Sequence, residues 1–567
     1  MCADENETEK TIFLFFIIYL NILLTIKQFN YEKTFSYFDA VVTFANGWAQ
    51  FGVGNYVTKG NFIYQITVAA AGANPGEVVL YGIRDGYNPV DESKALNLEG
   101  KITIGIVDGP SFDFIVTTAN ATALRNTYNF TTFDAAPTLV GPFAGMVIAE
   151  SVVIPKEFQT IVANTFYGYT NMKAISFQEE SEVETIQSGA FNTTQISSFD
   201  FSNCSKLTTI ENGLFVEADP AVNSYVENVW LPEASEALVT IGTAFQRLPN
   251  LQHVYNLENS KITTVAQDAF KGDVNLEEIA LPGTVVTIAE NAFRGSGITT
   301  LTIDVTSLND LTSGNVYGAG DDLTTLESLT LTGVLSGTFK PQAFKGCTKL
   351  ETIDMTGMTI TGGTIGASAF EGCTKLAALT FNPITGVDDT HVGTIGENAF
   401  KECTKLATLT FNGITGFEAA HPAVIGASAF EGCTKLGTIA FNGLENVTIL
   451  AKAFKSCVSG AVTTSSLSFG PLTNVTIVGT DDTDGAFNGT SKLTSISFGV
   501  SENLTINDFA FKGTASAGNA AALSFGDATN IVIGESAFIG AEKVETITFG
   551  NIEDDATPSP VFRVVLF

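Results

Sequence analysis

"AFEGCTKLAALTF", residues 369–381, decides the fold because the chain contains this stretch three times in nearly identical form. Residues 399–411 read "AFKECTKLATLTF" and residues 429–441 read "AFEGCTKLGTIAF", so the interval is 30 residues and the cysteine keeps its place. A sequence period of about 20–50 residues is typical of repeat proteins, in which each unit packs only against its neighbours. The stretch therefore predicts an array of stacked coils, and the near-identity of the copies indicates duplication.

Looser copies of the unit are marked by Ala-Phe dipeptides, most of them 23 to 33 residues apart, with degenerate copies at Phe166, Phe215 and Tyr317. Each aromatic shares its unit with other core positions, so we interpret it as buried filling between coils rather than as a ligand-binding stripe. This interpretation accounts for the 44 Phe of the chain. The dipeptides end at Phe191, Phe245, Phe270, Phe293, Phe344, Phe370, Phe400, Phe430, Phe454, Phe487, Phe511 and Phe538.

Each unit has two halves. The first reads I-G-x-x-A-F-x-G-C, as in residues 365–373, and predicts a tight turn or a short helix. The second reads L-x-x-[IL]-x-[FL], as in residues 376–381, and its last apolar positions alternate with polar ones, which predicts a short strand with one buried face. A single unit cannot bury its own apolar face, so neighbouring units must stack and their strands must form one long parallel sheet.

The pattern resembles the leucine-rich repeats of BspA-like surface proteins. Residues 151–177, "SVVIPKEFQTIVANTFYGYTNMKAISF", resemble the opening repeat of such arrays, and residues 276–295, "LEEIALPGTVVTIAENAFRG", match a single repeat, including Pro282 after the strand. Later units carry Asn or Gly in place of that proline, and the loops at 382–394 and 412–424 are longer than usual. The resemblance implies a leucine-rich-repeat solenoid, with a parallel β-sheet on one face and short turns or helices on the other.

The domain organisation follows from where the repeats begin and end. We expect about 15 repeat units over residues 151–550, and a β-rich N-terminal capping region over residues 35–150. An independent ligand-binding β-domain is the alternative for residues 35–150. Within them, residues 61–68, 76–83, 100–107 and 111–118 alternate in polarity and predict strands. Residues 551–567 are expected to form a C-terminal cap or tail.

The N-terminal residues 1–34 contain an apolar run, Thr11–Ile26, that is interrupted only by Asn21. The run has the length of the apolar part of a signal peptide and is short for a membrane span of about 20 residues. We interpret it as a signal peptide or as an uncleaved signal anchor that tethers the chain to a membrane. A helix buried against the rest of the protein is the alternative.

The charge of the chain excludes one class of partner. Its net charge is −32, from 28 Lys+Arg against 60 Asp+Glu, and no basic cluster occurs. Nucleic-acid binding requires a cationic surface, so no nucleic acid is expected as a partner. The acidity is explained by solubility, with calcium binding as the alternative. Only 3 His are present, and no hydrolase, zinc-protease, phosphate-loop or dinucleotide-binding motif occurs, so we expect no enzyme and no cofactor.

Two sets of residues are candidates for metal or disulfide chemistry. Cysteines share one repeat position, but Asp273, Thr490, Thr514 and Ala541 stand at or near it in other units, so we interpret it as a small buried position rather than as a disulfide ladder or metal row. His391 and His421 lie 30 residues apart beside acidic residues, which is weak support for a metal site. The cysteines are Cys204, Cys347, Cys373, Cys403, Cys433 and Cys457.

The exposed strand positions are the candidate binding surface. They form a face of small polar side chains with acidic patches and almost no aromatic residues, so no strong anchor for a partner is expected on it. The candidates are Glu327, Glu351, Thr352, Asp354, Thr380, Thr408, Thr410 and Thr438.

The BspA resemblance implies a cell-surface or secreted interaction protein, adhesin-like, whose ligand is a protein or glycan on host matrix or neighbouring cells. A structural surface spacer or coat protein without a specific ligand is one alternative, and the plainness of the exposed face favours it. An ice-binding solenoid is another, because Thr rows on a flat sheet can match an ice lattice. The irregular Thr positions and the variable intervals speak against it.

Overall fold

The structure is a computed structural model of the 567-residue chain. It describes eight strands between residues 56 and 142, and residues 149–553 apart from 212, 216–224, 233–239, 290, 308–322, 340, 387–392, 459–464 and 519. The chain divides into two compact units, residues 1–194 and residues 195–567, and each is treated by itself. The predicted N-terminal apolar run at 11–26 and the C-terminal residues 554–567 lie outside the described part.

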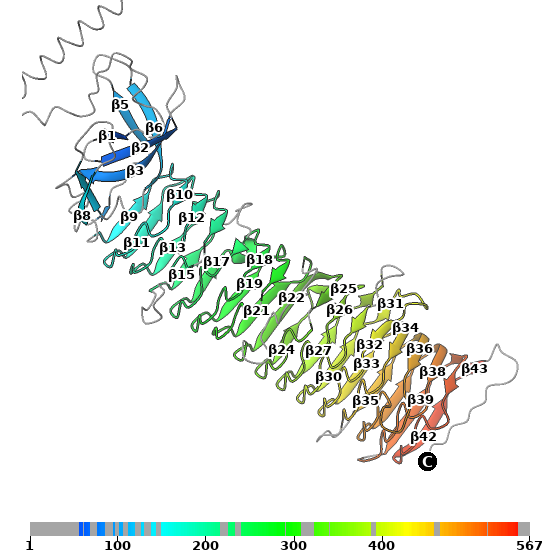
Figure 1. Ribbon diagram of the computed structural model, residues 1–567. Helices are drawn as coiled ribbons and strands as arrows, with labels where there is room; N and C mark the ends of the chain where they lie inside the picture. The colour runs from blue at the N-terminus through cyan, green and yellow to red at the C-terminus, as the bar shows by residue number, and fades with distance from the viewer. Residues whose placement is uncertain are drawn as a thin grey trace, which may run out of the picture. The chain divides into compact units, whose positions relative to one another are not determined.

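Unit 1 contains antiparallel strands followed by the first coils of the array (Figure 1). The four stretches predicted as strands correspond to β2, β3, β5 and β6. β4 pairs in parallel with β9 and β6 with β10, so two of the earlier strands extend the sheets of the first coil. That residues 35–150 act as a cap stays a prediction. The strands of unit 1 are β1 (Tyr56–Lys59), β2 (Phe62–Val68), β3 (Gly76–Arg84), β4 (Ala95–Leu96), β5 (Lys101–Gly105), β6 (Ser111–Ala119), β7 (Asn126–Asn129), β8 (Thr138–Pro142), β9 (Ser151–Ile154), β10 (Thr160–Ile161), β11 (Ala174–Phe177) and β12 (Thr185–Ile186).

Unit 2 is a parallel β-solenoid. Each coil contributes a strand from the L-x-x-[IL]-x-[FL] half of the repeat, here called a front strand. Neighbouring front strands pair one whole repeat apart, so that Ala378 pairs with Thr408 and Thr408 with Thr438. The front strands are β13 (Ser198–Asp200), β15 (Asn228–Trp230), β17 (His253–Tyr255), β19 (Glu278–Leu281), β21 (Thr300–Asp304), β22 (Ser328–Leu335), β24 (Thr352–Asp354), β27 (Ala378–Phe381), β30 (Thr408–Phe411), β33 (Thr438–Phe441), β35 (Ser466–Phe469), β37 (Ser495–Phe498), β39 (Ala521–Phe525) and β42 (Val544–Phe549).

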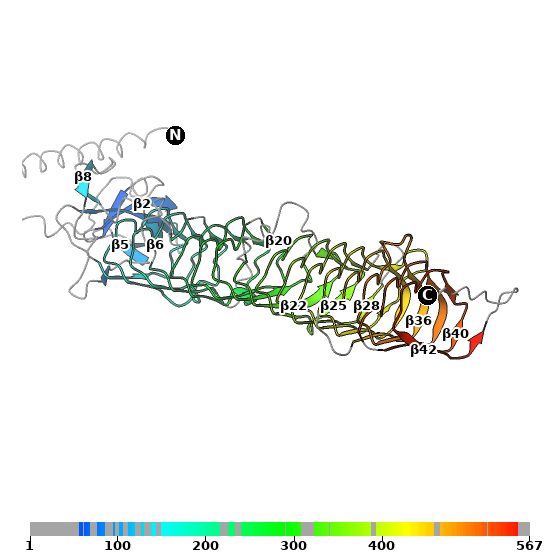
Figure 2. The same ribbon diagram turned by 90° about the horizontal axis from the view of Figure 1, so that it is seen from below.

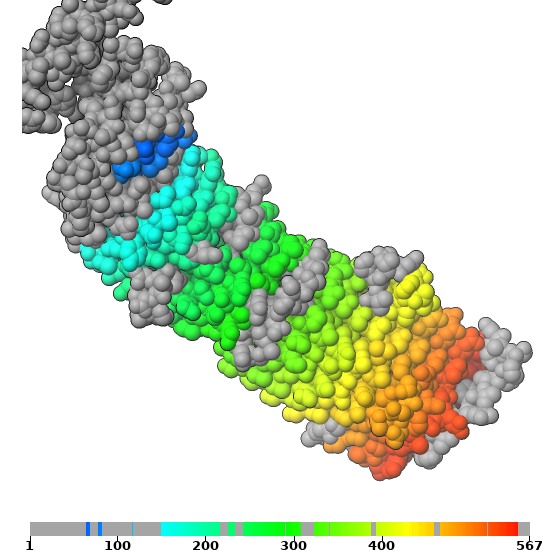
Figure 3. Space-filling model, in the orientation of Figure 1, coloured from blue at the N-terminus to red at the C-terminus, as the bar shows by residue number. Residues whose placement is uncertain are grey.

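A second row of parallel strands, here called back strands, precedes the Ala-Phe turns (Figure 2). The space-filling view shows the coils of unit 2 as contiguous bands in chain order (Figure 3). The back strands are β14 (Thr209–Ile210), β16 (Thr240–Ile241), β18 (Thr264–Val265), β20 (Thr287–Ile288), β23 (Thr338–Phe339), β26 (Thr364–Ile365), β29 (Thr394–Ile395), β32 (Ala423–Ile425), β34 (Leu444–Ile449), β36 (Leu472–Ile477), β38 (Ser501–Ile506) and β41 (Val532–Ile533).

The structure refines two details of the sequence prediction. Of the two forms expected for the Ala-Phe stretches, a tight turn or a short helix, the described coils have turns, and the described 3₁₀ helix η4 (Leu257–Asn259) lies elsewhere. The segments predicted as longer loops contain β28 (Ile384–Thr385) and β31 (Ile414–Thr415), which pair with each other and extend a row that starts at β25 (Met358–Thr361). The row gives these longer coils a third strand. Two further short strands, β40 (Ala528–Thr529) and β43 (Ile552–Glu553), pair near the end of the described residues.

The core contains two ladders of stacked phenylalanines. In the first ladder, the ring of Phe430 lies 5.3 Å from that of Phe400 and 5.1 Å from that of Phe454, nearly parallel to both. The second ladder ends the front strands, and Phe381 and Phe411 stack in it at 4.7 Å. The ladders meet edge to face, with Phe411 and Phe430 at 89°. The Ala-Phe aromatics that the structure describes are buried, so their prediction as filling between coils is confirmed; Tyr317 lies outside the described residues.

The shared cysteine position is confirmed as a small buried position. All six of its cysteines are buried. The Sγ of Cys433 donates to the carbonyl oxygen of Phe400 at 3.3 Å, one coil away, and burial raises the pKa of the Cys373 thiol well above its ordinary value. Thr490 and Thr514 stand at the same position, where their hydroxyl groups hydrogen bond to each other at 3.0 Å.

Asp273 is the acidic residue found at this repeat position, and its carboxyl group is buried. Its Oδ1 accepts the backbone N–H of Leu248 at 2.8 Å, whereas its Oδ2 has no hydrogen-bond partner. Burial raises the pKa of Asp273 well above its ordinary value, and the hydrogen bond from Leu248 opposes this only in part. The folded protein therefore holds the carboxyl proton at pH values where the unfolded chain, with a pKa of about 3.9, has released it.

We expect Asp273→Asn to remove a pH-dependent loss of stability. The folded state binds the extra proton, so the stability of the native chain falls as pH rises from about 4 toward the raised pKa of Asp273. The variant keeps an acceptor for Leu248 and cannot ionise. The difference in free energy of unfolding between the variant and the native chain should therefore grow by about 1.4 kcal/mol per pH unit across that window. Urea unfolding of both proteins from pH 3.5 to 7 measures the difference. A difference that does not change with pH would contradict the expectation.

Candidate functional site

The side chains that point outward from the front strands form one candidate surface, called the outward face below. Buried and outward positions alternate along most of these strands, as in β27, where Leu379 and Phe381 are buried and Ala378 and Thr380 are exposed. Because pairing is in register, outward positions of neighbouring coils form rows. One row contains Thr380, Thr410, Ala440, Ser468, Ser497, Ser524 and Thr548; the next contains Ala378, Thr408, Thr438, Ser466, Ser495, Ala522 and Thr546.

The structure places the predicted site residues on this face in two groups. Thr380, Thr408, Thr410 and Thr438 lie within the two rows, on β27, β30 and β33. The second group lies on β22 and β24 or immediately before them, in a different hydrogen-bonded sheet, and comprises Glu327, Glu351, Thr352 and Asp354. Ala440 interrupts the Thr row, so the face is not a regular threonine lattice.

Two acidic members of the second group, Glu351 and Asp354, are already held by neighbouring groups. Glu351 accepts a hydrogen bond from Lys375 Nζ at 2.8 Å, and this bond together with the lysine charge lowers the pKa of Glu351. The backbone N–H of Thr356 donates to Asp354 Oδ1 at 2.9 Å, and with the Thr356 hydroxyl it lowers the pKa of Asp354. Both side chains are therefore ionised at neutral pH, so they make this part of the face anionic rather than reactive.

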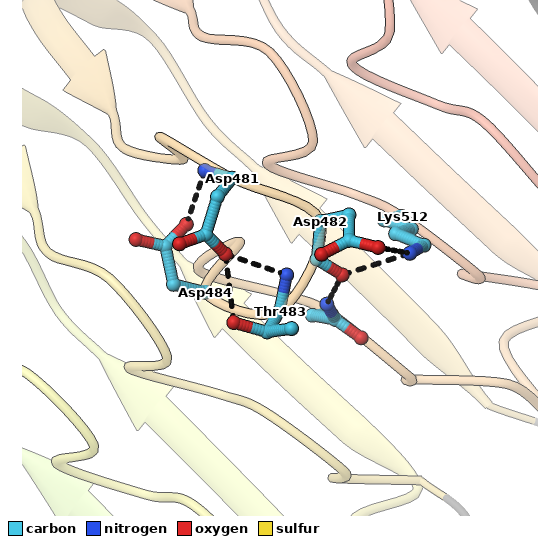
Figure 4. Close-up of polar contacts among 6 residues, drawn as sticks. Asp481, Asp482, Thr483, Asp484 and Lys512 are labelled. Carbon is cyan, nitrogen blue, oxygen red and sulfur yellow. Dashed lines mark hydrogen bonds and ion pairs between the residues drawn. The ribbon is translucent and has the colours of Figure 1, made fainter.

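The carboxylates of an acidic loop at residues 480–484 accept hydrogen bonds from within the loop and contact a lysine of the next coil (Figure 4). Asp481 Oδ1 accepts the backbone N–H and the hydroxyl of Thr483, each at 2.7 Å, and these bonds lower the pKa of Asp481. Asp484 Oδ1 accepts the backbone N–H of Asp481 at 3.0 Å, and Lys512 Nζ lies 3.2 Å from Asp482 Oδ2. The three carboxylates therefore stabilise a turn and tie it to the next coil.

Metal chemistry finds no support in the described part of the chain. No group of three or more His, Cys, Asp or Glu side chains there could hold a metal ion. His421 is exposed, and His391 lies outside the described residues. Four of the six buried cysteines donate to a carbonyl oxygen of the preceding coil, as the bond from Cys457 to the Phe430 carbonyl illustrates.

An asparagine ladder crosses the back strands. Asn474 Nδ2 donates to Asn446 Oδ1 at 2.9 Å, Asn503 Nδ2 to Asn474 Oδ1 at 2.8 Å, and Asn530 Nδ2 to Asn503 Oδ1 at 3.1 Å. All four residues adopt a left-handed backbone conformation with φ of 52° to 55°, which asparagine tolerates better than most residues. The ladder is a structural device that binds one coil to the next.

The earlier coils of the outward face carry aromatic residues at outward positions, which the sequence prediction, made for positions from Glu327 onward, did not cover. The rings of Trp230 and Tyr255 stack at 4.7 Å with an interplanar angle of 15°, and His253 lies 5.2 Å from Tyr255. Trp230 and Tyr255 are register partners on β15 and β17. The sequence signal was an aromatic residue at the fifth position of the L-x-x-[IL]-x-[FL] half, in "VENVWL" and "LQHVYN".

The fold and the outward face define a leucine-rich-repeat solenoid. The family description "BspA type Leucine rich repeat region" matches residues 141–255, 239–377, 321–468 and 419–551. These matches cover well over half of the 567 residues. The chain therefore belongs to the BspA-type leucine-rich-repeat family.

Solved structures of bacterial proteins are similar to the chain. A leucine-rich repeat protein from Bacteroides ovatus is 17% identical over 78% of this chain and 94% of its own, with a TM-score of 0.29. The pneumococcal vaccine antigen PcpA is 18% identical over 74% and 94%, with a TM-score of 0.28. A leucine rich cell surface protein from Faecalibacterium prausnitzii is 18% identical over 87% and 94%, with a TM-score of 0.22. No curated protein matches the chain.

Among the described residues, no helix is both long enough and apolar enough to cross a membrane.

Proposed function

We propose that the chain is a non-enzymatic interaction protein of the cell surface or of the secreted fraction, and that the outward face of its solenoid binds a macromolecule on host matrix or neighbouring cells. The observation that carries the proposal is the registered outward face itself. Its side chains are held in rows by a stacked core, so a ligand meets a preorganised surface and orders few side chains on binding. Repeat solenoids present extended binding surfaces of this kind.

The composition of the face supports an interaction role over catalysis. The predicted site residues are hydroxyl groups and ionised carboxylates, and those with shifted pKa values are shifted further toward the charged form. A general acid or base needs a pKa near the working pH. A surface spacer without a ligand is the alternative, and the small side chains of the Thr and Ser rows favour it.

The test has two arms on cells that express the protein. Protease shaving of intact cells, followed by peptide mapping, should release peptides from residues 151–550. The labelled full-length chain should then bind neighbouring cells or matrix with saturation. Failure to release repeat peptides contradicts the surface location, and abundant display without saturable binding supports the spacer.

A further inference from the structure

One patch of the outward face differs from the rest in chemistry. Along the described front strands of unit 2, the outward-facing positions carry mostly Thr, Ser, Ala, Asn and acidic residues, with Val334 near the end of β22 and the residues on β15 and β17 as exceptions. There they carry Trp230, His253 and Tyr255, called the aromatic patch below. The chain contains only 2 Trp, so placing one of them on the surface of a strand is a marked departure from the local pattern.

The geometry of the patch leaves aromatic surface open to solvent. Tyr255 is 39% exposed and Trp230 is half-buried. The two rings stack on each other across the paired strands β15 and β17; β13 pairs with β15 on one side, and β19 is the neighbour of β17 on the other. The outward residues next in line are short: Asp200 pairs with Trp230, and β19 carries Ala280. No long side chain from these two positions competes for the exposed part of either ring.

The backbone holds the patch in place. Val229 between the outward positions is fully buried, and the Nδ2 of Asn256, directly after Tyr255, donates to the carbonyl oxygen of Leu231 at 2.9 Å. Leu231 N in turn donates to the carbonyl oxygen of Tyr255 at 3.0 Å. On the other side of the stack, His253 N donates to the carbonyl oxygen of Glu227 at 3.2 Å. The strands that carry the two rings are thus tied together before and after the stack, and binding needs little further ordering.

The charges around the aromatic patch favour a cationic ligand group. The outward acidic side chains on the flanking strands are Asp200 on β13 and Glu278 on β19, and Glu227 is exposed directly before β15. The outward positions of the described strands β13, β15, β17 and β19 carry no Lys or Arg. An aromatic ring face attracts a cation, and neighbouring carboxylates add to that attraction. Trp and Tyr are also the side chains that dominate binding energy in protein interfaces.

We infer that the aromatic patch is the anchor site for a basic segment of a partner protein, which places an arginine or lysine side chain against Trp230 or Tyr255 between the flanking carboxylates. This inference rests on the interaction role proposed above and adds the chemistry of the partner. Arginine fits best, because its planar guanidinium group stacks on a ring while it donates to a carboxylate. The net charge of −32 brings basic segments to the surface, and the patch fixes where they bind.

The test uses the full-length chain and a fluorescent tetra-arginine peptide, with anisotropy measured at an ionic strength of about 0.15 M to screen distant charges. We expect saturable binding that weakens about tenfold in the double variant Trp230→Thr/Tyr255→Thr. Other coils carry threonine at the repeat position of Trp230 and Tyr255, as at Thr380 and Thr410, so the variant should keep its fold. Val500→Thr/Val532→Thr, which changes two exposed residues away from the front strands, is the control and should bind like the native chain.

Two further variants and two further probes complete the test. Asp200→Asn/Glu278→Gln keeps both rings and should weaken peptide binding about threefold. This variant decides the outcome if the double aromatic variant fails to fold. In a Trp48→Phe background, where Trp230 is the remaining tryptophan, the peptide should change its emission. Equal binding by native and patch variants, or a saturable response to cellotetraose with none to the peptide, overturns the inference. If protease shaving of cells releases no repeat peptides, this contradicts the proposed surface location but not peptide binding at the aromatic patch.

Discussion

Replacing Phe430 with alanine should lower the free energy of unfolding of the coils around it by about 3–5 kcal/mol, the usual range for truncating a buried aromatic side chain. Phe430 is fully buried. Its ring stacks between Phe400 and Phe454 and meets Phe411 edge to face. The variant leaves a void in the first ladder that also borders Phe411 of the second ladder. The backbone holds the neighbouring rings in register, so they cannot close the void.

Urea unfolding followed by circular dichroism measures this effect, and hydrogen exchange locates it, because a long array can lose its coils in parts. Phe549→Ala is the matched control. Phe549 is the last described ring of the second ladder and is 49% exposed, so its removal should cost far less. If the two variants lose equal stability, the stacked ladders do not hold the coils together.

Gly396→Ala should destabilise the solenoid by about 1–3 kcal/mol through lack of space. A Cβ atom at Gly396 would lie 2.7 Å from the backbone nitrogen of Ala367 and 2.7 Å from the carbonyl oxygen of Ile365, in the preceding coil. The close approach is the result of a hydrogen bond, since Gly396 N donates to the Ile365 carbonyl oxygen at 2.8 Å. Backbone atoms cannot move aside as the end of a flexible side chain would, so the coils must separate.

A second glycine separates this cause from backbone conformation. Gly372 has φ of +76°, but the nearest atom to a Cβ there is 3.9 Å away. Glu402 occupies the same repeat position with φ of 61°, so Gly372→Glu should cost only about 1 kcal/mol. Thermal unfolding of both variants measures the difference. A larger loss for Gly372→Glu than for Gly396→Ala would show that backbone conformation, rather than lack of space, sets the cost of replacing these glycines.

Most of the coil could be predicted from the sequence because one pattern repeats many times. The positions of Leu376, Leu379 and Phe381 in the core follow from their alternation with exposed residues, and the small buried position of Cys373 follows from its replacement elsewhere by Ala and Thr. The second Ile-Thr strands, such as β28 and β31, were not predicted. They are two residues long, and only pairing with the next coil makes them strands.

The aromatic patch was missed for a different reason. Trp230 and Tyr255 are 25 residues apart, and only the register of β15 with β17 brings their rings to 4.7 Å. The sequence prediction followed outward positions from Glu327 onward, where the face carries small polar residues. A carboxyl group with a raised pKa was also not predicted at Asp273, because the pattern shows that the position is small but not that its Oδ2 lacks a partner.

The outward face as the binding surface is the central claim, and saturation binding of the labelled full-length chain to intact neighbouring cells tests it most directly. The comparison is between Thr380→Lys/Thr438→Lys, on the outward face, and Val500→Lys/Val532→Lys, which changes exposed residues (62% and 59%) away from the front strands. The account predicts that the first variant loses saturable binding while the second binds like the native chain. Equal binding by both variants, or loss only in the second, would contradict it.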